Sequence, residues 1–164
     1  MIRKAIIADA RAIHKLLLNY ARDGLVLPRS LSEIYEQIRD FYVFIDDERV
    51  LGAVALNICW EDLAEVRSLV VEANHMGKGI GRRLVEACLS EARQLGLKQI
   101  FALTYEPEFF ERLDFHKIDK AELPQKIWGD CLKCAKFPDC DEIAMSLTLL
   151  NQEMLPGSTL PATS

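Results

Sequence analysis

One segment constrains this chain more than any other: three glycines alternate over five positions within residues 75–84, HMGKGIGRRL. The glycines follow an apolar run at residues 69–71 and open a segment whose apolar residues have helical spacing. Because glycine has no Cβ, the backbone can approach an anion closely, and the helix N-terminus behind the loop adds its dipole. A plain tight turn also uses glycines, but the order of strand, glycine loop and helix favours a pyrophosphate cradle and hence a nucleotide-like cofactor.

The chain has enough residues for one domain with a sizeable core, since it is 164 residues long and 50% hydrophobic. We expect this domain over residues 1–150 and a disordered tail over residues 151–164, which contain two prolines and a glycine. The net charge of −5 and the absence of a basic stripe argue against nucleic acid as a partner. No apolar run is long enough for a membrane span, and the apolar start is too short for a signal peptide. We therefore expect a cytoplasmic protein.

Apolar periodicity predicts an order of β-α-α-β-β-β-α-β-α-β-β. The fold class that this order indicates is α+β or mixed α/β, with one twisted, mostly antiparallel sheet flanked by helices. An antiparallel meander comes first, and a β-α-β unit then carries the glycine loop. Strict alternation in the strand at 65–71 would place Glu65, Arg67, Leu69 and Val71 on one face. The expected strands are 2–7, 41–45, 50–59, 65–71, 99–104, 115–118 and 143–149, and the expected helices are 8–22, 30–38, 80–95 and 107–113.

Two of these segments resemble motifs of the GNAT family, the Gcn5-related N-acetyltransferases. The glycine loop is similar to their acetyl-CoA signature, Gln/Arg-x-x-Gly-x-Gly/Ala, and residues 108–115, EFFERLDF, are similar to their F-Y-E-K-L-G-F segment. The resemblance covers residues 2 to about 149 and implies the GNAT fold, N-acetyltransferase activity and acetyl-CoA as co-substrate. The residues that it assigns to acetyl-CoA binding are Leu69, Val70, Val71, Met76, Gly77, Lys78, Gly79, Ile80, Gly81, Arg82 and Phe110.

The chain departs from the family pattern at two of these positions. Met76 occupies the place of the signature's leading Gln or Arg, although Lys78 and Arg82 are near enough in sequence to compensate. Phe110 occupies the place of the tyrosine that serves the family as general acid. The thiolate then leaves unassisted, or Tyr105 or water protonates it. Unassisted departure is chemically reasonable, because a free thiol has a pKa of about 8.5.

A narrower resemblance, to short bacterial N-acetylglutamate synthases, rests on segments such as LPRS at 27–30, AEVRSL at 64–69 and WGDCLKC at 128–134. It implies acetylation of the α-amino group of L-glutamate, the first step of arginine synthesis, by direct transfer through a tetrahedral intermediate. Two alternatives stay open. The acceptor could be another small-molecule amine or a protein N-terminus, or the chain could be a non-catalytic acetyl-CoA-binding module.

Amine acetylation needs a base and, for an acidic acceptor, cations. Glu65 is the candidate base, acting through water, and the alternative is a strand carboxylate paired with Arg67. Arg29, Arg67 and Lys126 are the candidate ligands for the carboxylates of the acceptor, although each one alone also fits a surface charge. His75 fits a solvated or phosphate-adjacent position better than a base.

The five cysteines do not indicate a disulfide framework, since their number is odd. Cys59 and Cys88 lie in apolar runs and are expected to be reduced core residues. Cys131, Cys134 and Cys140 form a C-x2-C-x5-C cluster. Zinc usually takes four ligands, so the cluster alone assigns no metal, although Asp130, Asp141 or His116 could supply the fourth ligand. A metal site, a redox-sensitive pair at Cys131 and Cys134, and simple loop packing all stay open for this cluster, and a homodimer is compatible with the sequence.

Overall fold

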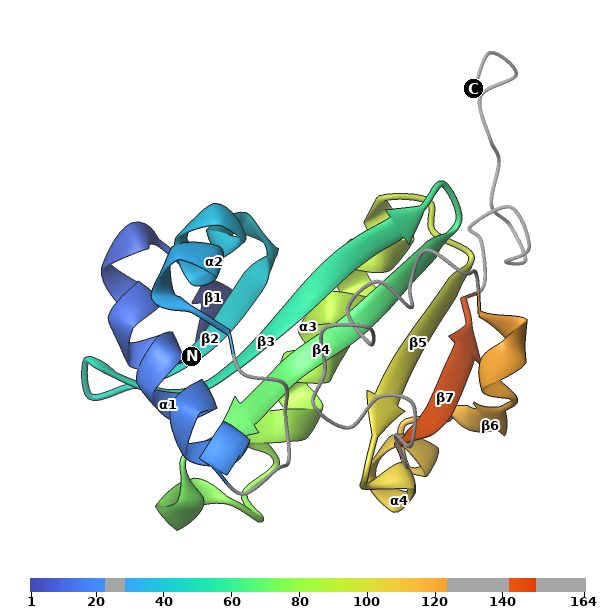
Figure 1. Ribbon diagram of the computed structural model, residues 1–164. Coiled ribbons are helices and arrows are strands. Elements are labelled where there is room, and N and C mark those ends of the chain that lie inside the picture. The colour runs from blue at the N-terminus through green and yellow to red at the C-terminus, as the bar shows by residue number, and fades with distance from the viewer. Residues whose placement is uncertain (23–28, 124–141, 150–164) are drawn as a thin grey trace, which may run out of the picture.

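The computed structural model describes residues 1–22, 29–123 and 142–149, which form a seven-stranded sheet with helices on both faces (Figure 1). The helices and strands follow the predicted order, with short 3-10 turns between several of them. The strands are β1 Ile2–Lys4, β2 Phe41–Asp46, β3 Arg49–Trp60, β4 Leu63–Val71, β5 Gln99–Thr104, β6 His116–Ile118 and β7 Ile143–Thr148. The helices are α1 Ala10–Arg22, α2 Leu31–Glu36, α3 Ile80–Gln94 and α4 Pro107–Glu111.

The strands lie in the order β1-β2-β3-β4-β5-β7-β6, and β4 and β5 are the parallel pair among them. β1 to β4 pair antiparallel, α3 then crosses behind the sheet, and β5, β7 and β6 pair antiparallel again. In Figure 1, α1 and α2 lie in front of the sheet and α3 lies behind it. The predicted fold class, the antiparallel meander and the β-α-β unit are confirmed.

The apolar residues form separate clusters on the two faces of the sheet. Behind the sheet, α3 buries Leu84 and Cys88 against β3, β4 and β5, and in front of it α1 and α2 bury Ile13 and Ile34 against β2 and β3. The spacing of apolar residues predicts a buried face of α3 made of Ile80, Leu84, Cys88, Ala92 and Leu95. The first four are buried, whereas Leu95, directly after the helix end at Gln94, is 56% exposed. No helix within the described residues is long and apolar enough to cross a bilayer.

The N-terminal strand is shorter than the predicted range of 2–7 because Asp9 turns the chain. Its buried carboxylate accepts hydrogen bonds from both terminal nitrogens of Arg3, at 2.7 and 3.1 Å, and from the Ile6 N–H at 2.8 Å. Burial alone would raise the pKa of Asp9, but the bonds from Arg3 and Ile6 outweigh it and hold the pKa below the usual 3.8. This pair fixes the turn that leads from β1 into α1.

A β-bulge in β4 corrects the predicted faces of that strand. Ala55 pairs with Arg67 but Ala53 pairs with Val70, so two residues of β4 oppose one of β3, and Ser68 adopts a φ of +57°. Beyond the bulge, each side chain of β4 points to the face opposite the one that strict alternation predicts. Leu69 and Val71 therefore pack on the α3 side, while Val70 joins the cluster beneath α1 and α2. The prediction that Leu69 and Val71 share a face with Arg67 was wrong.

β4 and β5 separate soon after they pair. Their register covers residues 63–65 of β4 and 99–101 of β5, and the two strands then diverge toward their carboxyl ends (Figure 1). The remaining length of β4, which includes the bulge, faces the space between the two strands. This part of the sheet is where a ligand can bind against strand backbone.

Candidate functional site

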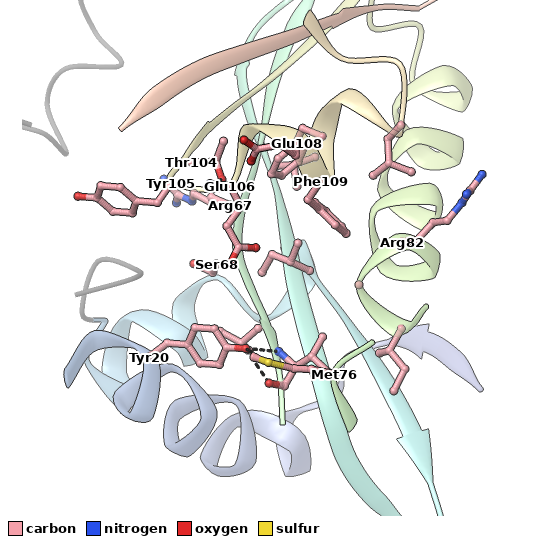
Figure 2. A pocket seen from close by; sticks show the side chains of 18 of the residues that line it. Tyr20, Arg67, Ser68, Met76, Arg82, Thr104, Tyr105, Glu106, Glu108 and Phe109 are labelled. Carbon is pink, nitrogen blue, oxygen red and sulfur yellow. Dashed lines mark hydrogen bonds between the residues drawn. The ribbon is translucent and has the colours of Figure 1, made fainter. Parts of the chain in front are cut away.

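A cavity of about 780 Å³ lies where β4 and β5 diverge. One wall is β4 from Glu65 to Val71, and the opposite wall comes from the end of β5 and from α4 (Figure 2). The glycine loop and the start of α3 close one end. The sequence analysis predicted fifteen residues that bind the cofactor, bind the acceptor or catalyse the reaction. Thirteen of them line this cavity: Arg29, Glu65, Arg67, Leu69, Val70, Val71, Met76, Gly77, Gly79, Ile80, Gly81, Arg82 and Phe110.

The glycine loop forms an open backbone cradle at the N-terminus of α3. Gly77 and Gly79 have φ values of +79° and +82°, and no heavy atom lies within 4 Å of a Cβ built on either residue. Gly79 is the N-cap of α3 and carries no side chain that could satisfy the first N–H groups of the helix. Free space, exposed N–H groups and the helix dipole together suit a phosphate.

Three side chains near this loop that could carry positive charge, those of Arg82, Lys78 and His75, differ in their contacts and exposure. Arg82 lines the cavity, but its Nε donates to Glu86 at 2.8 Å, and Figure 2 shows its guanidinium directed away from the other labelled residues. Lys78 is exposed. His75 lines the cavity with its Nδ1 3.7 Å from Glu72. If Lys78 or Arg82 replaces the Gln or Arg side chain that position 76 lacks, it therefore has to reorient to reach a phosphate.

Tyr20 of α1 contacts the end of β4 across 51 residues of sequence. Its hydroxyl donates to the Val71 carbonyl oxygen at 2.8 Å, and the Val71 N–H reaches the same hydroxyl at 3.5 Å (Figure 2). The Met76 sulfur lies 3.9 Å from the hydroxyl. Tyr20 thus joins α1 to the strand end and to the residue that precedes the glycines.

Two arginines and a glutamate, Arg29, Arg67 and Glu65, line the same cavity. Arg67 Nη1 is 3.8 Å from Glu65 Oε1, and both side chains are 12% exposed. Arg29, whose side chain is 9% exposed, lies 3.7 Å from Glu33, the residue that also closes the capping box of α2 with Ser30. Lys126, the third predicted cation, lies outside the described residues.

The wall formed by α4 is aromatic and acidic. Phe110 is buried and packs edge-to-face against Phe109 and Phe115, with ring centroids 5.1 Å apart in both pairs. Tyr105 also lines the cavity, so it stays a candidate for the group that protonates the leaving thiolate in place of a tyrosine at position 110. Three carboxylates also line the cavity: Glu106 and Glu108 at the start of α4, and Glu142 directly before β7.

Cys59 and Cys88, the cysteines that the structure describes, are not among the residues that line this cavity. Cys88 is buried in the core, where burial raises the pKa of its thiol to about 12, and Cys59 is half-buried. Among residues 1–22, 29–123 and 142–149, no group of three or more His, Cys, Asp and Glu side chains could hold a metal ion. The predicted cluster of Cys131, Cys134 and Cys140 lies outside that part of the chain.

Three contributors to the site escaped the sequence reasoning. The helical spacing of Ile13, Leu16, Leu17 and Tyr20 places Tyr20 on the apolar face of the first predicted helix, and the hydroxyl on such a face is a signal that it has a polar partner. Gln37, which accepts a hydrogen bond from Arg67 at 3.4 Å, had no local signal. The bulge at Ser68 had none either, because neither glycine nor proline marks it.

Comparisons with known proteins agree with this geometry. The family model for the acetyltransferase (GNAT) family matches residues 11–117. An uncharacterised N-acetyltransferase of Chlorobaculum tepidum is 43% identical over 90% of this chain and 96% of its own length. An amino-acid acetyltransferase of Mycobacterium tuberculosis is 33% identical over 94% of this chain and 92% of its own.

A solved structure shows the same fold with ligands bound. The crystal structure of N-acetylglutamate synthase from Neisseria gonorrhoeae, complexed with coenzyme A and N-acetyl-glutamate, superposes with a TM-score of 0.84 at 25% identity. The match covers 92% of this chain but 35% of the synthase, so the chain spans about a third of that protein. The chain belongs to the GNAT family and is an N-acetyltransferase that uses acetyl-CoA as co-substrate.

Proposed function

We propose that this enzyme acetylates the α-amino group of L-glutamate, the entry step of arginine synthesis. The observation that carries the proposal is that two largely buried cations line the cavity that also contains the glycine loop: Arg67, which lies beside Glu65, and Arg29. An acceptor with two carboxylates and one amine matches two guanidinium groups and one carboxylate base. The names of the mycobacterial and gonococcal relatives support an amino-acid acceptor.

The cofactor side of the proposal assigns acetyl-CoA to the β4 wall and the glycine loop. The pyrophosphate would bind the N–H groups of residues 76–82, where the loop is open and α3 begins. The pantetheine arm would lie along Leu69, Val70 and Val71 in the manner of an added strand, with Phe110 packed beside it. This assignment brings the thioester to the bulge at Ser68, next to Glu65 and Arg67.

The chemistry then needs few groups. Glu65 would take a proton from the acceptor ammonium through a water molecule, so that the neutral amine can attack the thioester carbonyl. Backbone N–H groups of β4, released from regular pairing by the bulge, would stabilise the oxyanion. When the intermediate collapses, the C–N bond is kept and the C–S bond breaks. The nitrogen then gives its second proton to water, which leaves the amide, and the thiolate takes a proton from water or from Tyr105. A cytoplasmic location is part of the proposal.

A cationic acceptor is the second candidate, because Glu106, Glu108 and Glu142 also line the cavity. These carboxylates would favour a polyamine or a basic amino acid over L-glutamate. The two candidates rely on different lining groups, so the choice between them depends on whether the arginines or the carboxylates contact the acceptor.

The test measures CoA release with a thiol reagent, using acetyl-CoA and L-glutamate, L-glutamine, L-lysine or spermidine as acceptor. Selective turnover of L-glutamate supports the proposal. Preference for spermidine or lysine would support the cationic acceptor instead. CoA binding by calorimetry without turnover of any acceptor would point to a non-catalytic module. Phe110→Tyr would then be the first substitution to make, because it restores the tyrosine that serves the family as general acid.

A further inference from the structure

The backbone of Val71 faces away from the neighbouring strand β3. Val71 lies opposite Gly52 in the antiparallel register, and the N–H of the next residue, Glu72, donates to the Leu51 carbonyl at 2.8 Å. Residues that bond across an antiparallel ladder alternate with residues that do not, so the N–H and C=O of Val71 point to the other edge of β4. The register of β5 with β4 covers residues 63–65, too far along the strand to meet them.

The hydroxyl of Tyr20 lies on this edge of β4. It donates to the Val71 carbonyl at 2.8 Å and accepts from the Val71 N–H at 3.5 Å (Figure 2). A single hydroxyl thus takes the place of the N–H and the carbonyl that a paired strand would bring to Val71. Tyr20 and Val71 both line the cavity. A ligand that pairs with the backbone of Val71 therefore needs the position that the hydroxyl occupies.

The pantetheine arm of the cofactor is such a ligand. In the placement proposed above it lies along residues 69–71 as an added strand, and its amides would donate to the Val71 carbonyl and accept from the Val71 N–H. The Tyr20 oxygen is within hydrogen-bond distance of both groups. A pantetheine carbonyl can therefore take the Val71 N–H only after the hydroxyl has moved.

Tyr20 can turn without displacing the helix that carries it. The buried anchors of α1 are Ala10, Ile13 and Leu17, which are at most 1% exposed. Tyr20 lies further along α1, toward its C-terminal end, and is only partly buried. The contact of its hydroxyl with the Met76 sulfur is 3.9 Å long, and a thioether is a weak acceptor. Rotation of the tyrosine side chain is therefore enough to clear the edge of β4.

We propose that the Tyr20 hydroxyl occupies, in the free enzyme, the position on Val71 that pantetheine takes in the complex, and that acetyl-CoA displaces it on binding. The same hydrogen bond then stabilises the free enzyme and lowers its affinity for the cofactor. This inference rests on the proposed function, because it uses the placement of pantetheine along β4. It does not depend on which amine accepts the acetyl group.

Tyr20→Phe tests the competition, since it keeps the ring and removes the hydroxyl. The Kd of CoA, measured by calorimetry, should fall about three- to tenfold, because binding no longer breaks a hydrogen bond. The melting temperature of the ligand-free variant should be lower than that of wild type, and the gap should narrow at saturating CoA. Tyr35→Phe, at the exposed tyrosine of α2, is the matched control and should change neither quantity.

A fragment of the cofactor locates the competition. The nucleotide portion of CoA, 3′-phospho-ADP, has the pyrophosphate but no pantetheine arm. Its Kd should be the same for wild type and Tyr20→Phe, because nothing in it pairs with Val71. If Tyr20→Phe does not fold, as its melting curve would show, Tyr20→Leu also removes the hydroxyl and should tighten CoA in the same direction.

Unchanged or weaker CoA binding by Tyr20→Phe would refute the competition, because a hydroxyl that only supports β4 or only contacts the cofactor cannot lower affinity. Equal tightening of CoA and 3′-phospho-ADP would also refute it, since the competition would then lie at the phosphates. These results are separate from the function itself. Neither Kd involves an acceptor, so turnover of L-glutamate by wild type stands or fails independently, and retained CoA affinity in Gly79→Asp would refute the cofactor placement.

Discussion

Substituting Gly79 separates the backbone strain of the glycine loop from its role in binding. The residue has a φ of +82°, and a Cβ built on it meets no heavy atom within 4 Å. Gly79→Ala therefore creates no clash in the free protein, and its stability cost is that of a left-handed alanine, about 1–2 kcal/mol. For a domain of this length that corresponds to a melting temperature lower by about 2–8 °C.

The effect on CoA binding is expected to be larger and to depend on charge. The methyl group of Gly79→Ala would occupy space proposed for a phosphate and should weaken CoA at least about tenfold. An aspartate there adds a negative charge, worth about 4 kcal/mol of repulsion at 4 Å with an effective dielectric constant of 20, so Gly79→Asp should abolish measurable binding. In the free protein the same carboxylate lies at the N-terminus of α3, which recovers about 0.3–1 kcal/mol.

The assay combines thermal unfolding followed by circular dichroism with calorimetric titration of CoA. Gly96→Ala is the control, because Gly96 has a φ of +79°, has equally open space around its Cβ and lies beyond the other end of α3. It should show the same loss of stability with unchanged CoA affinity. Retained affinity in Gly79→Asp, or an equal loss of affinity in Gly96→Ala, would refute the cradle.

Three further substitutions have defined outcomes. Glu65→Gln should lower kcat about 10²-fold and remove the acidic limb of the pH–rate profile while CoA affinity is kept; an unchanged profile would exclude Glu65 as the base. Tyr20→Phe should lower the free energy of unfolding by about 1 kcal/mol, since the Val71 carbonyl loses its donor, and urea denaturation measures this. Asp9→Asn should destabilise by about 1–3 kcal/mol at pH 7. Because the folded pKa of Asp9 is lowered, its stabilising effect is fully present above the usual pKa of 3.8 and is lost as pH falls through the lower folded pKa, so an Asp9→Asn deficit that did not shrink at all as the pH fell below 3.8 would contradict it.

Sequence periodicity was sufficient for the architecture but not for the local geometry of β4. The order of elements, the capping box at Ser30 and the glycine loop all depend on local patterns, and the structure contains each of them. The bulge at Ser68 depends on how β4 pairs with β3, which no window of the sequence encodes. Extending strict alternation through it therefore placed Leu69 and Val71 on the wrong face.

The site shows the same division between local and tertiary information. Arg29, Glu65 and Arg67 were named from their sequence context, and the fold brings all three to one cavity. Gln37 and Tyr20 were not named, because their polar partners are 30 and 51 residues away and are reached only when α1 and α2 pack on the sheet. Their roles follow from contacts that the chain makes after folding.

The most direct measurement of the central claim is the ratio of kcat/KM for L-glutamate to that for spermidine with wild-type enzyme. The ratio compares recognition by the cavity's cations, Arg29 and Arg67, with recognition by its carboxylates, Glu106, Glu108 and Glu142. If the arginines receive the acceptor, L-glutamate should be preferred by at least about 10²-fold, and Arg67→Gln should reduce that preference. A ratio near one, or a preference for spermidine, would contradict an acidic amino acid as the acceptor.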